Sequence, residues 1–224
     1  MKTSSGRFSN QGFTLVGLII IVAVLAILAA MLLPALASAK QKAKRIQCVN
    51  NLKQCGLAFR VWAGDQTDRF PMEVSTSNGD TKEFDTGADT FRHFQVMSNE
   101  LSTPKILICP SDTRSATYNF AHLKNQNVSY FVGLDASDYR EGLEGRRRTF
   151  LDGDRNISAD NEPENGILKL VPGQRVSWTQ TMHVNQGNLG LSDGSVQQLS
   201  NSGLREALGN SGDATNAWRI ALPE

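Results

Sequence analysis

The stretch GFTLVGLIIIVAVLAILAAMLL, residues 12–33, decides how this chain is organised. No charged side chain occurs from Phe13 to Leu33, and nearly every residue in that run is apolar. A helix of this length rises about 30 Å and so crosses the hydrocarbon core of a bilayer. The sequence therefore predicts a transmembrane helix over residues 13–34. It follows a short leader, residues 1–12, which carries Lys2 and Arg7 and no acid.

Two ordinary interpretations account for part of this pattern. A secretory signal peptide has an apolar stretch of about 7–15 residues and a small-x-small cleavage site. Residues 35–37, Ala-Leu-Ala, provide such a site, but the apolar stretch before them is too long. A plain signal-anchor helix fits the length, yet it does not explain the sequence Gly-Phe-Thr-Leu-Val at the start of the span.

That edge, residues 12–16, resembles the cleavage and methylation site of type IV prepilins and type II secretion pseudopilins. The resemblance implies that a prepilin peptidase/methyltransferase cuts between Gly12 and Phe13 and methylates the new amine of Phe13. Pro34 fits as well, because pilin helices often carry a proline at this distance from the cut. The family is structural and not enzymatic. Its members are single-pass proteins of the inner membrane with an extracytoplasmic domain, and they assemble with other pilin-like subunits through the N-terminal helix.

Gly17 departs from the family pattern, which has a glutamate at this position. In family filaments that carboxylate neutralises the N-terminal amine of a neighbouring subunit, since an unpaired charge in hydrocarbon is costly. The sequence thus predicts a minor or initiating subunit of a type II secretion or type IV pilus-like filament. Two alternatives stay open. Filaments of this lineage assemble without requiring the glutamate, or the chain is a membrane-tethered binding domain that never polymerises.

The composition beyond the span fits a soluble domain rather than a nucleic-acid binder. Removing the leader lowers the formal net charge from +1 to −1, so no nucleic-acid partner is expected. Residues 35–64 continue as an amphipathic helix, whose apolar residues recur at helical spacing up to Gly64 and Asp65. The members of this stripe are Ala39, Ala43, Ile46, Val49, Leu52, Gly56, Phe59 and Trp62.

Residues 65–224 are predicted to form one extracytoplasmic domain with short strands. Asp193-Gly194 is expected to supply positive backbone angles in a tight hairpin over residues 189–196. The predicted fold class is α+β and pilin-like: a long N-terminal helix, transmembrane in its first half, packed on a small antiparallel sheet. The other expected elements are strands at 128–134, 149–151, 167–171, 175–182 and 218–222, and a short helix at 203–208.

A second resemblance is narrower. The segment RIQCVNNLKQ at 45–54, the segment CPSD at 109–112, and His183 followed after nine residues by Asp193-Gly194 are similar to a large pilin-like family of planctomycete and verrucomicrobial bacteria. Its C-terminal signature is H-X9-DG. The resemblance implies a disulfide between Cys48 and Cys109 that attaches the helix to the sheet.

The residues alone leave the cysteine pairing open. Cys48 and Cys55 lie two helical turns apart, about 10 Å, and cannot bridge each other. Either of them can reach Cys109, and an extracytoplasmic location favours oxidation. If the pairing is Cys48–Cys109, Cys55 stays as a buried thiol. Three reduced, buried cysteines remain the alternative.

No cofactor is expected from the sequence, and calcium is the alternative. Oxygen-bearing side chains alternate at Asp152, Asp154, Asn156, Ser158 and Asp160, as they do in a calcium loop. The glycine expected at the sixth position of such a loop is missing, however, and Ile157 stands there. A structural turn after a strand is the preferred interpretation.

No residue pattern in the chain predicts catalysis. His183 and Asp193 are compatible with a metal pair or an acid–base dyad, but a hydrogen-bonded histidine beside a turn aspartate explains them equally. No serine nucleophile motif, phosphate-binding loop or HExxH motif occurs. The run Arg146–Arg148 is expected to be a solvated loop, with contact to DNA or an acidic polysaccharide as the alternative.

Overall fold

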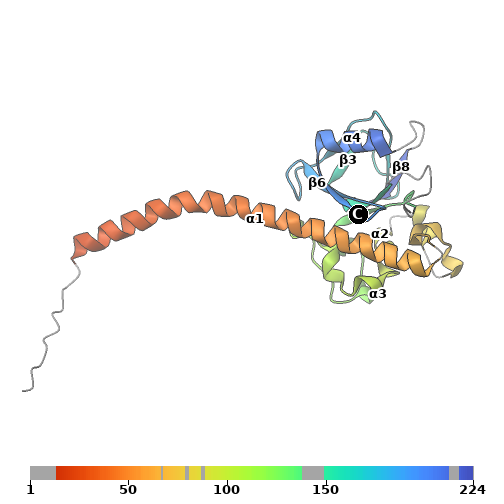
Figure 1. The fold of residues 1–224 in the computed structure, drawn as a ribbon, viewed down its shortest axis with the longest axis horizontal. Helices are drawn as coiled ribbons and strands as arrows, with labels where there is room; N and C mark the ends of the chain where they lie inside the picture. The colour runs from red at the N-terminus through yellow and green to blue at the C-terminus, as the bar shows by residue number, and fades with distance from the viewer. Residues whose placement is uncertain are drawn as a thin grey trace, which may run out of the picture. The chain divides into compact units, whose positions relative to one another are not determined.

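The structure is a computed structural model that describes residues 14–66, 68–78, 81–86, 89–137, 149–211 and 217–223 (Figure 1). The chain divides into two compact units, Met1–Lys42 and Ala43–Glu224. The first helix, α1, runs from Leu15 to Asp65 and so contributes to both units. It ends at the Gly64-Asp65 boundary that the sequence predicts.

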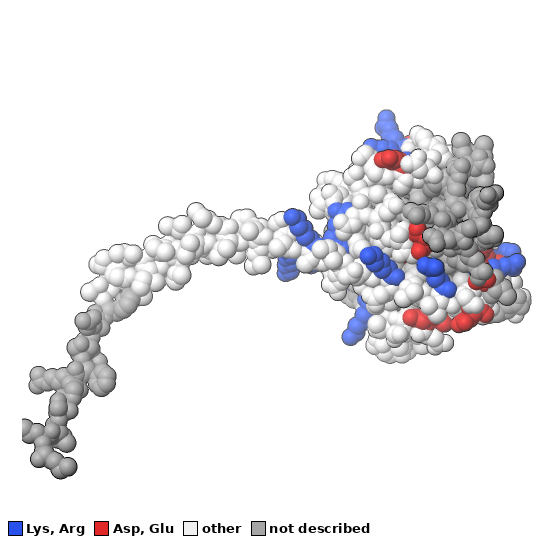
Figure 2. Space-filling model, viewed as in Figure 1, with Lys and Arg blue, Asp and Glu red and all other residues white. Residues whose placement is uncertain are grey.

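In the first unit, α1 is a helix whose side chains point into solvent. Every large apolar side chain from Leu15 to Leu36 is exposed. Figure 2 shows this part of the helix without any charged side chain. The helix is long and apolar enough to cross a membrane. Its surface therefore needs lipid or other apolar helices around it, because water is a poor solvent for so much contiguous apolar area.

The second unit is built on a six-stranded antiparallel sheet with the strand order β4-β8-β1-β2-β6-β7. Its strands are β1 (Tyr130–Gly133), β2 (Phe150–Asp154), β4 (Ile167–Leu170), β6 (Gln186–Leu191), β7 (Val196–Ser200) and β8 (Trp218–Ala221). A second sheet pairs β3 (Ile157–Ala159) with β5 (Val176–Trp178). The other helices are α2 (Thr90–Gln95), α3 (Ser98–Leu101) and α4 (Asn201–Ser211), and short 3-10 turns cover Pro71–Glu73, Thr76–Asn78, Lys82–Thr86, Pro104–Leu107, Phe120–His122 and Asn125–Asn127.

Each face of the six-stranded sheet carries its own hydrophobic core, because successive strand side chains point to opposite faces. Tyr130 and Val132 of β1 belong to the core that contains α1 residues such as Phe59. Phe131, between them in sequence, belongs to the other core, together with Leu204 of α4. Figure 1 shows α4 on one side of the sheet and α2 and α3 on the other. This arrangement confirms the predicted α+β class.

The buried face of α1 begins later than the sequence predicts. Cys48, Leu52, Cys55, Phe59 and Trp62 are buried, and these positions follow a spacing of three and four residues. The earlier members of the predicted stripe are exposed, including Ala39, Ala43 and Ile46. Ile46 precedes Cys48 by two residues, which places it about 200° away around the helix. The apolar character of that stripe was therefore not a sign of burial at these three positions.

The β6–β7 hairpin is tight, as predicted, but its turn differs in detail. The amide N–H of Gly194 donates to the carbonyl of Leu191 over 2.8 Å, and the Leu191 N–H donates to the Ser195 carbonyl over 2.9 Å. Of the pair Asp193-Gly194, only Gly194 has a positive φ, at +83°. This is a three-residue turn in which glycine supplies the left-handed position. Asp193 instead accepts hydrogen bonds from Ser195 through its carboxylate.

The predicted strand at 175–182 is also shorter than expected. β5 ends at Trp178, and the chain then forms a loop in which Met182, Val184 and Asn185 all have positive φ. Residues in that conformation cannot continue a strand. β2 is longer than predicted and extends to Asp154, so two of the proposed calcium ligands lie within a strand.

Candidate functional site

The N-terminal processing site lies at the edge of the described chain. Gly12 and Phe13, the predicted cleavage and methylation residues, fall outside the described residues, and so does Arg146–Arg148. The first described residue, Thr14, caps the helix, since its hydroxyl accepts a hydrogen bond from the Gly17 amide at 3.2 Å. The helix that follows this cap is the apolar segment described above.

In the second unit, Cys48 of α1 and Cys109 form a disulfide with a Cα–Cα distance of 5.0 Å. Both residues are fully buried, and Cys55 is a buried free thiol. The pairing is the one that the second resemblance implies. Asn51 adds a second link one turn further along α1, because its amide donates to the Ile108 carbonyl at 2.9 Å. Helix α1 is thus joined covalently and by hydrogen bonding to the segment before β1.

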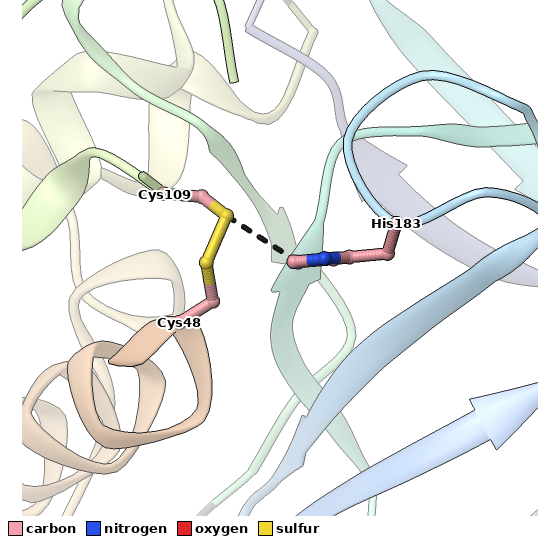
Figure 3. Close-up of side chains that lie close together, drawn as sticks. All are labelled: Cys48, Cys109 and His183. Carbon is pink, nitrogen blue, oxygen red and sulfur yellow. Dashed lines mark hydrogen bonds between the residues drawn. A yellow bond between two sulfur atoms is a disulfide. The ribbon is translucent and has the colours of Figure 1, made fainter. Parts of the chain in front are cut away.

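His183 lies directly beside this disulfide (Figure 3). Its Nε2 atom is 3.3 Å from Cys109 Sγ and 3.4 Å from Asp154 Oδ2, and its side chain is 3% exposed. The carboxylate next to His183 is therefore that of Asp154. Asp193, the partner considered from the sequence, lies in the hairpin turn, where its carbonyl accepts a hydrogen bond from Arg60 at 3.1 Å.

The spacing of the H-X9-DG pattern corresponds to one strand and its two flanking loops. His183 precedes β6, and the Asp193-Gly194 turn follows it. Both ends of this strand contact α1. At one end the Arg45 guanidinium donates to the Gln186 side chain, beside His183. At the other end Gly56 faces Gly194, since a Cβ on Gly56 would lie 3.7 Å from the Gly194 Cα. The pattern thus marks the strand that runs along α1.

Asp154 is fully buried, and its Oδ2 atom accepts hydrogen bonds from the Asn188 amide N–H at 2.7 Å and from Asn188 Nδ2 at 2.8 Å. Burial raises the pKa of Asp154 to about 7, although Asn188 and Arg45 act in the opposite direction. Burial lowers the pKa of His183 to about 4, and Arg45 adds to that effect. At neutral pH the imidazole is therefore uncharged, and the contact between His183 and Asp154 is not a strong ion pair.

Asp152 lies two residues before Asp154 on the same face of β2. It is also fully buried, and burial, followed by repulsion from Asp154, raises its pKa well above the ordinary value. The residue opposite Asp152 across the sheet is Gly190. A Cβ on Gly190 would lie 1.8 Å from Asp152 Oδ1, so glycine is needed there. The two carboxyl groups form a polar core under α1.

The calcium candidates lie in different surroundings. Asp152 and Asp154 lie buried within β2, whereas the Asp160 carboxylate accepts a hydrogen bond from the Arg175 amide at 3.0 Å, beside the small sheet. Asn156 points its Nδ2 atom at three carbonyls, those of Thr179, Thr181 and Gln186. It thereby shapes the loop that carries His183. The alternating oxygen-bearing residues thus belong to a strand and the turn that follows it, which is the interpretation the sequence favoured.

Asp154 lies beside His183, Asn188 donates hydrogen bonds to Asp154, and Asn156 holds the loop that carries His183. Sequence reasoning did not assign these roles. The Asp-x-Asp spacing of Asp152 and Asp154 could have indicated this arrangement. Acids at every second position of an otherwise apolar strand place their carboxylates on one buried face. Among the described residues, the group of three thiol, imidazole or carboxylate donors close enough to share a metal ion is Cys48, Cys109 and His183.

Comparison with known proteins bears on the N-terminal segment. Residues 7–33 match the family described as the prokaryotic N-terminal methylation motif. No curated protein and no solved structure matches the chain. The motif supports a type IV pilin-like subunit that is processed by a prepilin peptidase, anchored in a membrane by its N-terminal helix, and assembled with other pilin subunits. It favours a structural role over an enzymatic one.

Proposed function

We propose that this chain is a minor or initiating subunit of a type II secretion or type IV pilus-like filament. The single observation that carries this proposal is the methylation motif over residues 7–33, which leads directly into an exposed apolar helix. The prepilin peptidase cuts after Gly12 and methylates the amine of Phe13. The subunit then sits in the inner membrane with its second unit outside the cytoplasm, until it is extracted into a filament.

The exposed surface of α1 gives a physical reason why the subunit lies first in the membrane and later in a filament. Its large apolar side chains from Leu15 to Leu36 are exposed. Lipid covers them before assembly, and the helices of neighbouring subunits cover them afterwards. Small residues such as Ala26 and Ala29 let such helices approach closely. The Cys48–Cys109 disulfide supports an extracytoplasmic second unit, because disulfides persist in oxidising compartments.

Gly17 is the reason for proposing a minor or initiating role. Without a carboxylate at this position, the subunit offers no partner for the N-terminal amine of a neighbour, and burying that charge unpaired is costly. A subunit at the start of a filament has no earlier neighbour to neutralise. It joins the filament without needing that interaction.

Fractionation of the native host tests the proposal. The chain should be recovered with sheared surface filaments or the isolated secretion filament, at a small fraction of the major subunit. Gly12→Val should block cleavage and leave the full-length chain in the membrane. Gly17→Glu should raise the amount in filaments, because it restores the missing ion pair. Absence of the wild-type chain from every filament fraction contradicts the proposal.

The second candidate is a membrane-tethered binding domain that never polymerises, and Gly17 is the observation that favours it. A tether needs the apolar helix but no interaction with the amine of a neighbour. In that case the wild-type chain and the Gly17→Glu variant both stay in the membrane after shearing. Since the two candidates differ in where the mature chain is found, the same fractionation distinguishes them.

A further inference from the structure

The disulfide lies among donor atoms that a disulfide alone does not need. Cys48 Sγ, Cys109 Sγ and His183 Nε2 all lie within 4.8 Å of one another. The Oδ2 atom of Asp154 lies 3.4 Å from the same histidine nitrogen. Once the disulfide is reduced, two thiols, an imidazole and the neighbouring carboxylate are ligands of the kinds that Zn²⁺ binds in tetrahedral sites.

Two of the distances between these atoms agree with a tetrahedral site. Zinc bonds of about 2.0–2.3 Å separate neighbouring ligand atoms by roughly 3.3–3.8 Å. Cys109 Sγ and His183 Nε2 are 3.3 Å apart, and His183 Nε2 and Asp154 Oδ2 are 3.4 Å apart. The two sulfurs, which are bonded to each other, lie closer than this. Reduction frees them to separate by rotation of a cysteine side chain.

The backbone around His183 is held in an unfavourable conformation. Met182 and Val184, its two neighbours, have φ angles of +64° and +52°. For β-branched valine this region is a marked outlier, and such strain gathers at functional sites. The side-chain amide of Asn156 holds the loop in place through hydrogen bonds to the Thr181 and Gln186 carbonyls. The fold thus maintains a strained loop that directs the imidazole at the two sulfurs.

The surroundings also suit a metal. Asn188 orients the Asp154 carboxylate with two hydrogen bonds, as outer-shell groups commonly do for ligands. Zn²⁺ with two thiolates, one carboxylate and a neutral imidazole carries one negative charge. The guanidinium of Arg45 interacts electrostatically with Asp154 and balances that charge. Cys48, Cys109 and Asp154 are fully buried, so the bound ion would be shielded from water.

We propose that the reduced chain binds one zinc ion through Cys48, Cys109, His183 and Asp154, so that zinc and the disulfide are alternative links between α1 and the sheet. Zinc binding to the two thiols releases their two protons. A partner protein's disulfide then accepts two electrons from the thiolates. The Cys48–Cys109 bond forms, the partner's sulfurs take up two protons and leave as thiols, and zinc is released. The zinc form belongs to the chain before its oxidation.

The test uses the full-length chain in detergent micelles. Metal-free protein is reduced with a phosphine, titrated with zinc, desalted and assayed for bound metal. We expect one zinc per reduced chain and none per oxidised chain at this site. His183→Ala and Asp154→Asn should weaken binding at least tenfold, while Cys55→Ala, which removes the remaining thiol, should bind as the wild type does. Cobalt in place of zinc should give the absorption of a tetrahedral thiolate complex.

Folding of the reduced chain is followed by circular dichroism in the same titration. If reduction unfolds the second unit, zinc should restore the folded spectrum in the wild type and in Cys55→Ala but not in Cys48→Ser. A reduced chain that binds no zinc, or that binds it equally well after His183→Ala and Cys48→Ser, overturns the proposal. So does a reduced, unfolded chain that zinc leaves unfolded.

Discussion

Gly56 of α1 and Gly194 of the β6–β7 turn face each other, so closely that a Cβ on Gly56 would lie 3.7 Å from the Gly194 Cα. The contact lies at the opposite end of β6 from His183 and the Cys48–Cys109 disulfide. β6 is therefore attached to α1 at both of its ends. This double attachment explains why a histidine and an Asp-Gly turn are separated by the length of one strand.

Gly194→Ala should destabilise the second unit by about 1–2 kcal/mol, because alanine is strained at a φ of +83°. Gly209→Ala is the matched control. Gly209 lies in helix α4, a Cβ there would meet nothing within 4 Å, and alanine should stabilise the helix by about 0.5–1 kcal/mol. Chemical denaturation of the full chain in micelles measures both. Equal effects of the two substitutions would show that the turn does not require a left-handed residue.

Gly190→Ala should be more damaging, since its Cβ would overlap the Asp152 carboxyl group at 1.8 Å. We expect a loss of about 1–3 kcal/mol from this overpacking. Asp152→Ala removes the atoms involved, so the double variant should lose less stability than the sum of the two single variants. A double-mutant cycle measures this coupling. Strictly additive effects contradict the close packing of Gly190 against Asp152.

Reduction of the disulfide in the presence of a metal chelator should lower the free energy of unfolding by about 4 kcal/mol, given a sequence separation of 61 between the two cysteines. The loss arises because the unfolded chain gains conformational entropy once the disulfide no longer closes the loop. Thermal unfolding with and without a phosphine reductant measures the change. The Cys55→Ala variant should show the same difference, and a difference that depends on Cys55 would point to another pairing.

Asp112 accepts two hydrogen bonds from Arg155, each of 2.7 Å. Burial raises the pKa of Asp112, but Arg155 and further hydrogen-bond donors outweigh it, so that the net pKa lies below 3.8. A depressed carboxyl pKa stabilises the fold above the unfolded value, and this contribution disappears as the pH falls through the folded value. The stability that this pair provides should therefore be lost below about pH 4.

Asp112→Asn tests that pair. We expect it to lower stability by about 2 kcal/mol at neutral pH, and this loss should shrink as the pH falls below about 4 and the wild-type carboxylate takes up its proton. Asp89→Asn is the control, because the Asp89–Arg92 pair is exposed and contributes little. Denaturation curves across this pH range give both values. A loss in Asp112→Asn that stays constant down to pH 2 contradicts the assignment.

The long helix and the antiparallel domain could be predicted because their signals are local. A charge-free run predicts the span, and three- and four-residue spacing predicts the face that contains Leu52 and Phe59. Ile46 was misassigned because an apolar residue on a helix shows only that burial is possible. Its exposure depends on where the sheet begins to cover α1, which local sequence does not encode.

The surroundings of His183 could not be read from local patterns for a similar reason. Alternating acids such as Asp152 and Asp154 fit both a calcium loop and a strand, and the two readings differ only in tertiary context. Asp193 was the nearest acid in the sequence motif, but the acid beside His183 in space is Asp154. That contact depends on the order of strands in the sheet, with β2 paired to β6.

The mass of the mature N-terminus tests the central claim most directly. Protein purified from the native host, digested and analysed by tandem mass spectrometry should begin at Phe13 and carry a methyl group on the α-amine. The Gly12→Val variant should retain residues 1–12. A native chain that begins at Met1, or at a residue after Ala37, contradicts the account.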